Sequence, residues 1–225
     1  MSIKCMYHFD SIKSFNSFTE IIEQINWKIE KQLLKERVQV YCKTDLYKTL
    51  KTQFEKGKLT IWPLKEEEII TWIDTLSIMR RCMMQLYKKG IYSERLQIIM
   101  EYPLVYGNHM RTDYLLVYDR LIIVLEFGMF NQDEKRSEER YTKKLQDSIT
   151  HRQVLHNMIH RDVKIVNYVM IYRPEYDRYI EARYADNIRY NDQEIQLLTN
   201  FITEHIREQD QISALSQLES INIFI

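Results

Sequence analysis

The stretch from Arg111 to Phe130, R-T-D-Y-L-L-V-Y-D-R-L-I-I-V-L-E-F-G-M-F, decides the fold of this chain. Two apolar runs, rich in Leu, Ile, Val and Tyr, flank the dipeptide Asp119-Arg120. This composition is typical of strands buried near the middle of a sheet. We therefore predict two adjacent strands that are joined by a tight turn.

The hairpin carries two acids, Asp113 and Glu126. If the turn has two residues, Tyr118 faces Leu121, and continued pairing places Asp113 directly opposite Glu126, with Cβ atoms ~5 Å apart. Carboxylates that close repel each other unless a cation or a proton lies between them. A hard divalent metal is the usual functional answer. The alternative is that one or both acids lie at a sheet edge in water.

The composition limits the classes of protein that remain. The 225 residues, of which 45% are hydrophobic, allow one substantial core with a small appended subdomain. Lys plus Arg and Asp plus Glu both number 32, so net charge argues neither for nor against a nucleic-acid partner. Only 4 glycines are present, and neither a P-loop nor a GxGxxG fingerprint occurs.

The cysteines and the apolar runs bear on the location of the protein. Cys5, Cys42 and Cys82 are scattered and show no zinc-binding spacing, which predicts reduced thiols in a cytoplasmic protein. The N-terminus has no apolar signal-peptide core. No uninterrupted apolar run reaches the ~18 residues that a membrane span requires, so we expect no membrane association.

Residues 1–64 are expected to form an α-rich N-terminal extension without a chemical motif. Apolar residues at three- and four-residue steps predict a helix over 18–36, with Ser17 as its N-cap. The other expected elements of this segment are a first strand around Ile3–Phe9, a strand over Val38–Cys42, a helix over Leu46–Lys56 and a strand over Leu59–Trp62.

Residues 65–190 are expected to form the core, and residues 191–225 a C-terminal helix and tail. The predicted core elements around the hairpin are a helix over Lys65–Lys89, a strand over Leu96–Tyr106, a helix from Ser137 to His160 and a strand over Lys164–Tyr172. The tail would hold a helix over Asp192–Glu208 and a short strand over Ile221–Ile225. The order α-β-β-β-α-β predicts an α/β fold with a mixed central sheet flanked by helices.

The segment from His160 to Asn167, H-R-D-V-K-I-V-N, matches the catalytic loop of protein kinases letter for letter. A kinase also needs a glycine-rich loop upstream and a D-F-G sequence downstream, and this chain has neither. The segment is instead expected to join the end of a helix to a strand, so we interpret the match as coincidence.

The element order and the paired acids resemble the PD-(D/E)xK nuclease superfamily, which has the restriction-endonuclease-like fold. The matching segments are R-T-D, ending at Asp113, and L-E-F-G, from Leu125 to Gly128, and the resemblance covers about the middle half of the chain. It implies hydrolysis of phosphodiester bonds with Mg²⁺ or Mn²⁺. Asp113 and Glu126 would hold the metal, which activates water and neutralises charge on the scissile phosphate.

The chain departs from the family pattern at the motif lysine, because Gly128 stands there. Pairing places Arg111 opposite Gly128, so its guanidinium is one substitute, and it would also bind phosphate. Lys143 or Lys144 from the following helix is the other, since relocation of the lysine to that helix is known in the superfamily. The resemblance also suggests Gln146 near the substrate and Glu101 as a further metal ligand, although both are common as solvated polar residues. The helix histidines, His151, His156 and His160, are expected at the surface.

The first hypothesis is therefore a nuclease that acts on nucleic acid, with DNA preferred over RNA. Small nuclease domains often work beside a motor or targeting subunit, and a homodimer is also compatible with the sequence. A tyrosine- and arginine-rich stretch over 172–190 would suit base stacking or simple packing. The second hypothesis is a catalytically inactive nuclease-fold subunit that binds nucleic acid or protein. The third is an unrelated α/β interaction protein, which requires Asp113 and Glu126 to lie far apart.

Overall fold

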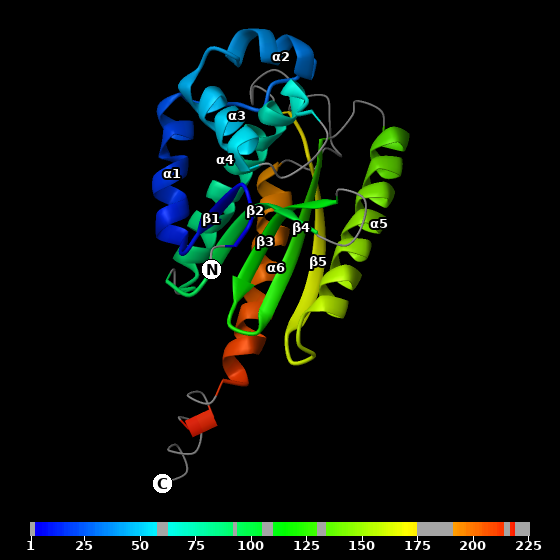
Figure 1. Ribbon diagram of the computed structural model, residues 1–225. Helices are drawn as coiled ribbons and strands as arrows, with labels where there is room; N and C mark the ends of the chain where they lie inside the picture. Colours follow the sequence, from blue (N-terminus) through cyan, green and yellow to red (C-terminus); the bar gives the residue numbers. More distant parts are fainter. Residues whose placement is uncertain are drawn as a thin grey trace.

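The computed structural model describes residues 3–57, 63–91, 94–104, 110–129, 134–174, 191–213 and 217–218. Its centre is a five-stranded sheet in the order β1-β2-β3-β4-β5 (Figure 1). The strands β1 to β4 pair with one another in antiparallel fashion, and β5 pairs with β4 in parallel fashion. The strands are β1 (Tyr7–Phe9), β2 (Gln97–Pro103), β3 (Arg111–Tyr118), β4 (Leu121–Met129) and β5 (Lys164–Tyr172). The α/β fold with a mixed sheet is as predicted from the sequence.

The central hairpin has the register expected from its two-residue turn. Tyr118 pairs with Leu121, and the ladder continues outward to the pair Tyr114 and Leu125. Asp119, in the turn, has a φ of 49°, a left-handed conformation that Asp tolerates better than most residues. The next step of the same register brings Asp113 beside Glu126.

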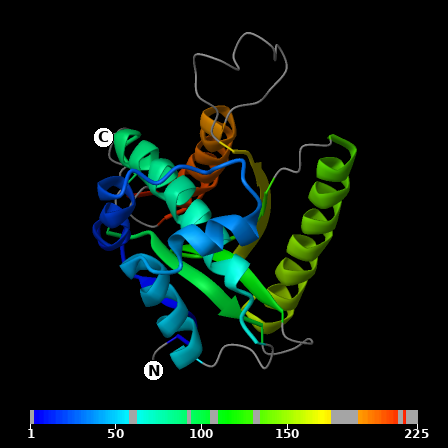
Figure 2. The same cartoon turned by 90° about the horizontal axis from the view of Figure 1, so that it is seen from above.

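The helices cover the two faces of the sheet unequally. Helix α5 (Glu134–Met158) alone lies on one face, against β4 and β5. Figure 2 shows the other helices together on the opposite side. There α4 (Glu66–Lys88) and α6 (Asn191–Gln211) contact each other, and α1 (Ile12–Gln24), α2 (Leu34–Tyr41) and α3 (Asp45–Gly57) pack on α4. The large core lies on this α4 side, whereas the α5 side has a small apolar cluster around Val124 and Leu155.

Helix α4 follows directly from local sequence signals. Three glutamates, Glu66 to Glu68, lie in its first turn, where carboxylates interact favourably with the helix dipole. Lys88 lies in the last turn, and Gly90 follows with a φ of 77°, which glycine adopts without steric cost. Because the helix is fully formed and buried along most of its length, it is the support on which α1, α2 and α3 pack.

The N-terminal extension differs from the prediction in two places. The predicted helix over 18–36 is wrong, because α1 begins after the cap Ser11 rather than Ser17 and ends at Gln24. The predicted strand over Val38–Cys42 is also wrong, because this segment lies largely in α2. The α2 segment is helical where a strand was predicted, and a long-range ion pair anchors it. The fully buried Arg37 donates two hydrogen bonds to Asp74 of α4, at 2.8 and 2.7 Å. This contact fixes α2 as a separate helix.

Three predictions fall on parts of the chain that lie outside the described residues. They are the strand over 59–62, most of the Tyr/Arg-rich stretch over 172–190, and the strand over 221–225. The N-terminal extension contributes β1 to the sheet of the core. None of the described helices combines the length and the apolar character needed to cross a bilayer.

Candidate active site

The acid pair lies where β3 begins and β4 nears its end. Backbone amides bind both carboxylates: Phe127 N donates to Asp113 Oδ2 at 2.7 Å, and Asp113 N donates to Glu126 Oε1 at 3.4 Å. The Glu126 side chain is 1% exposed, and that of Asp113 is 27% exposed. The alternative that Glu126 lies in water at a sheet edge is therefore excluded, whereas Asp113 is partly exposed, and the pair forms one partly enclosed site.

A cation lies between the two carboxylates, and it is supplied by the chain itself. The Nζ atom of Lys144, from α5, lies 3.2 Å from Asp113 Oδ2 and 2.9 Å from Glu126 Oε2. Of the substitutes considered for the missing motif lysine, Lys144 is the one that reaches the acid pair. Because β4 and β5 are parallel, the helix that connects them, α5, crosses over the sheet and packs against both strands. Lys144 on this helix is thereby brought beside Glu126 of β4.

His151 is a second α5 residue at the pair, and it was expected at the surface. That expectation is wrong, since His151 is 5% exposed and its Nδ1 lies 2.9 Å from Glu126 Oε1. Lys144 and His151 are seven residues apart, which is two turns of a helix, so both project toward the sheet. Each oxygen of Glu126 is therefore bonded to one α5 side chain.

The charges of the site are strongly coupled. Burial raises the pKa of Glu126, and so does the neighbouring Asp113, whereas His151 and Lys144 lower it without cancelling that rise. Burial alone would lower the pKa of the Lys144 ammonium, but Asp113 and Glu126 outweigh burial and raise it. Lys144 therefore stays protonated at neutral pH and cannot serve as a general base there.

Arg111 and Glu101 form a separate buried cluster on the α4 side. Arg111 Nε lies 3.1 Å from Glu101 Oε2, and Arg111 Nη2 donates to Glu68 Oε2 at 2.8 Å. Trp72 Nε1 donates to Glu101 Oε1 at 2.8 Å. Burial raises the pKa of Glu101 to about 8, against the opposing effect of Arg111.

This cluster corrects two expectations. Arg111 does not fill the place of the motif lysine, because its guanidinium is bound by Glu101 and Glu68. Glu101 lines the same pocket as Asp113, but its carboxylate is bound by Trp72 and Arg111, and it does not form a three-ligand metal group with Asp113 and Glu126. Its φ is 54°, a left-handed value, and β2 has no pairing partner at this position. The side chain is consequently turned toward α4, away from the face on which Ile99 contacts the α5-side cluster.

Gly128 is closely packed, which explains why no lysine stands there. A Cβ atom added to Gly128 would lie 2.6 Å from Cδ1 of Ile171 on β5, and 3.4 Å from Cγ and Cδ of Arg140 on α5. Arg140 is held in place by a hydrogen bond from Nη1 to the carbonyl oxygen of Met129. The space of the motif side chain is thus taken by Ile171 and Arg140.

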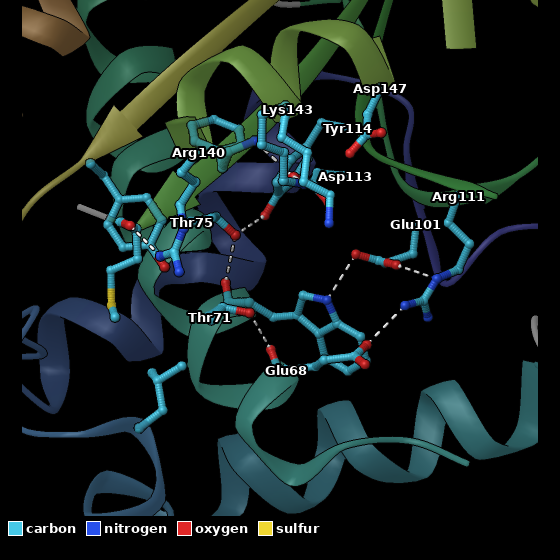
Figure 3. Close-up of a pocket in the computed structure, with 17 residues that line it drawn as sticks. Glu68, Thr71, Thr75, Glu101, Arg111, Asp113, Tyr114, Arg140, Lys143 and Asp147 are labelled. Atoms are coloured by element: carbon cyan, nitrogen blue, oxygen red, sulfur yellow. Dashed lines mark hydrogen bonds and ion pairs between the residues drawn. The ribbon is translucent and has the colours of Figure 1, made fainter. Parts of the chain in front are cut away.

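The acid pair opens into a pocket of about 480 Å³ at the end of the sheet, between α4 and α5. Figure 3 shows Arg111 with Glu101 and Glu68 on one side of this pocket and Arg140 on the opposite side, with Asp113 between them. Its α5 wall includes Arg140, Lys143, Lys144 and Asp147, and its α4 wall includes Trp72 and Thr75. Lys143 is exposed but lines the pocket, whereas Gln146 is exposed and does not line it.

The donor set of the pair suits one hard cation. The Lys144 ammonium demonstrates that a single cation position faces both Asp113 and Glu126, and carboxylate oxygens are the ligands that Mg²⁺ and Mn²⁺ prefer. Among the residues that the structure describes, no group of three or more His, Cys, Asp or Glu side chains is arranged to hold a metal ion. Asp113 and Glu126 would therefore hold a metal with water or substrate completing its coordination.

Sequence reasoning missed three residues of the site: His151, Arg140 and Asp147. A signal for them was present in the composition of α5, whose sheet-facing side is polar at Lys144, Ser148 and His151 before it becomes apolar at Leu155. Ser148 belongs to the same stripe, since it is buried and accepts a hydrogen bond from Asn167 of β5 at 2.9 Å. A polar stripe at helical spacing on a buried helix face indicates a site rather than core packing.

Comparison with known proteins gives no independent assignment. No protein-family model matches the sequence, and no curated protein matches it. The function has to be inferred from the chemistry of Asp113, Glu126 and the α5 residues that contact them.

Proposed function

We propose that this protein is a metal-dependent phosphodiesterase that hydrolyses nucleic acid, with DNA preferred over RNA. The observation that carries the proposal is the Lys144 ammonium bound to both Asp113 and Glu126. The acids are brought together by the hairpin, and the lysine comes from the helix that follows, within the element order α-β-β-β-α-β. These are the acids, the cation and the order that the PD-(D/E)xK resemblance implies, with the lysine relocated.

The side chains divide the work of hydrolysis. Asp113 and Glu126 would hold Mg²⁺ or Mn²⁺, which supplies Lewis-acid stabilisation of the phosphate and lowers the pKa of bound water. Lys144 is a permanent positive charge beside this position, so it orients the attacking water and offsets the charge that develops on the phosphate. His151 keeps Glu126 in a fixed rotamer through its hydrogen bond to Oε1. Arg140 and Lys143, on the pocket wall, are placed to bind a substrate phosphate.

The test is cleavage of linear, circular and single-stranded DNA and of RNA, with Mg²⁺ or Mn²⁺ and with EDTA. The variants are Asp113→Ala and Glu126→Ala, with Asp119→Asn as a matched control. Asp119 lies on the same hairpin at the far end from the pair, and Asn accepts its left-handed backbone equally well. We expect metal-dependent cleavage by the parent chain and the control and none by either acid variant. Cleavage that survives loss of an acid would contradict the proposal.

A second candidate function is an inactive nuclease-fold subunit that binds nucleic acid or protein. Gly128 and Arg140 favour it, because no side chain can extend from the motif position without displacing its neighbours. The same substrates separate the two candidates. An inactive subunit would bind nucleic acid without cutting it, and the acid variants would bind as well as the parent chain does.

A further inference from the structure

The hydrogen bonds of the acid pair leave one shared position between its carboxylates. Glu126 Oε1 is bonded to His151 and to the Asp113 amide, and Asp113 Oδ2 also accepts from the Phe127 amide. The position that faces both Asp113 Oδ2 and Glu126 Oε2 holds the Lys144 ammonium, at 3.2 and 2.9 Å. The ammonium is therefore in the place where a cation that bridges the two acids would bind.

A divalent metal and this ammonium cannot share that position. Mg²⁺ binds carboxylate oxygens at ~2.1 Å, so a metal bridging the same two oxygens would overlap the ammonium nitrogen. Charge leads to the same conclusion, because two carboxylates with one ammonium keep a net charge of −1, while a divalent cation neutralises both. Repulsion between the metal and the ammonium at such a separation is large in a partly enclosed site.

Asp147 offers the ammonium a second partner. It lies three residues after Lys144 on α5, the spacing at which a carboxylate and an ammonium pair on a helix surface, and it lines the same pocket. Figure 3 shows the Asp147 carboxylate on the pocket wall above Asp113. Within the described part of the chain, no hydrogen bond or ion pair already engages it.

We propose that Lys144 and a divalent metal are mutually exclusive occupants of the Asp113–Glu126 pair, and that Asp147 is the positioning residue that receives the displaced ammonium. The inference rests on the proposed function, since it concerns the same metal position. Before metal binds, Lys144 offsets one of the two negative charges and holds α5 against the hairpin. After metal binds, the ammonium moves to Asp147 and remains beside the pocket, where a phosphate would meet it.

The test is Mn²⁺ binding to the full chain, measured by isothermal titration calorimetry for the parent, Lys144→Met, Asp147→Asn and the double variant. Removing the competing ammonium should tighten binding by about tenfold or more. Removing its receiver should weaken binding by about 1.4- to 2.3-fold, as expected for a helical ion pair of modest strength. In the Lys144→Met background, Asp147→Asn should have no such weakening effect. Lys48→Met is the matched control, because this exposed lysine of α3 lies outside the pocket, and it should bind like the parent chain.

Two further measurements keep the outcome decisive. Lys144→Gln replaces Lys144→Met in the calorimetry if the Met variant folds poorly. In a thermal melt, the rise in melting temperature that Mn²⁺ causes should be larger for either Lys144 variant than for the parent chain. Mn²⁺ binding that is equal or weaker after removal of Lys144 would overturn the inference while leaving the proposed function standing. Absence of binding in the parent and in both Lys144 variants would overturn the proposed function together with the inference.

Discussion

His151 provides the sharpest stability test of the site. The imidazole is 5% exposed and lies 2.9 Å from Oε1 of a carboxylate that is itself 1% exposed. A hydrogen bond to a buried charged group contributes about 1.5–3 kcal/mol to stability. Without the His151 bond, Oε1 of Glu126 keeps only the longer hydrogen bond from the Asp113 amide. We therefore expect His151→Ala to lower the free energy of unfolding by about 2–3 kcal/mol.

The assay is urea unfolding at pH 7 in EDTA, supported by thermal melts, where a loss of this size corresponds to roughly 4–12 °C for a chain of this length. His156→Ala is the matched control, because this exposed histidine lies on the same helix, and it should change stability by less than about 0.5 kcal/mol. His151→Asn should recover most of the loss, since an Asn amide nitrogen lies near the position of Nδ1. The reasoning would be refuted if His151→Ala cost no more than His156→Ala, or if Asn gave no recovery.

Three further outcomes follow from the buried charges and from Gly128. Arg37→Ala should cost about 3–5 kcal/mol in urea unfolding, because it removes the guanidinium that donates two hydrogen bonds to the fully buried Asp74 carboxylate. The exposed Lys35→Ala on the same helix should cost almost nothing. Burial raises the pKa of the Glu101 carboxyl to about 8 in the folded protein, from an ordinary pKa of 4.5. The stability that this carboxyl contributes is therefore complete below about pH 4.5 and is lost as the pH rises toward 8. Glu101→Gln should remove that part of the decline, and an unchanged slope between pH 5 and 8 would contradict the assignment. Gly128→Ala should cost about 1 kcal/mol through overpacking, and Ile171→Val, which removes the contacting Cδ1, should reduce that cost.

The hairpin and the acid pair could be predicted from sequence because their signals are local. A two-residue turn between apolar runs fixes the register of both strands, and register alone brings Asp113 beside Glu126. The sequence left three candidates for the missing motif cation, Arg111, Lys143 and Lys144. Choosing between neighbours requires the rotation of α5 about its axis, and that rotation is set by packing against β4 and β5.

The errors arose where distant residues decide the conformation. Nothing local indicates that Glu101 adopts a φ of 54°, a conformation in which its carboxylate contacts Trp72 and Arg111. The apolar spacing over 18–36 suggested one helix, but Trp27 and Ile29 are buried in a non-helical segment. Long-range partners override helical periodicity in such segments.

Asp113 and Glu126 are proposed to bind a divalent metal together, in place of the Lys144 ammonium. The most direct measurement is an anomalous difference map from crystals of the full chain soaked in Mn²⁺, with Asp113→Asn crystals treated identically. We expect a peak within coordination distance of both carboxylates, with the Lys144 ammonium moved away from them, and no peak in the variant. A Lys144 ammonium that still bridges the acids at saturating Mn²⁺, or a peak elsewhere that Asp113→Asn leaves unchanged, would contradict that proposal.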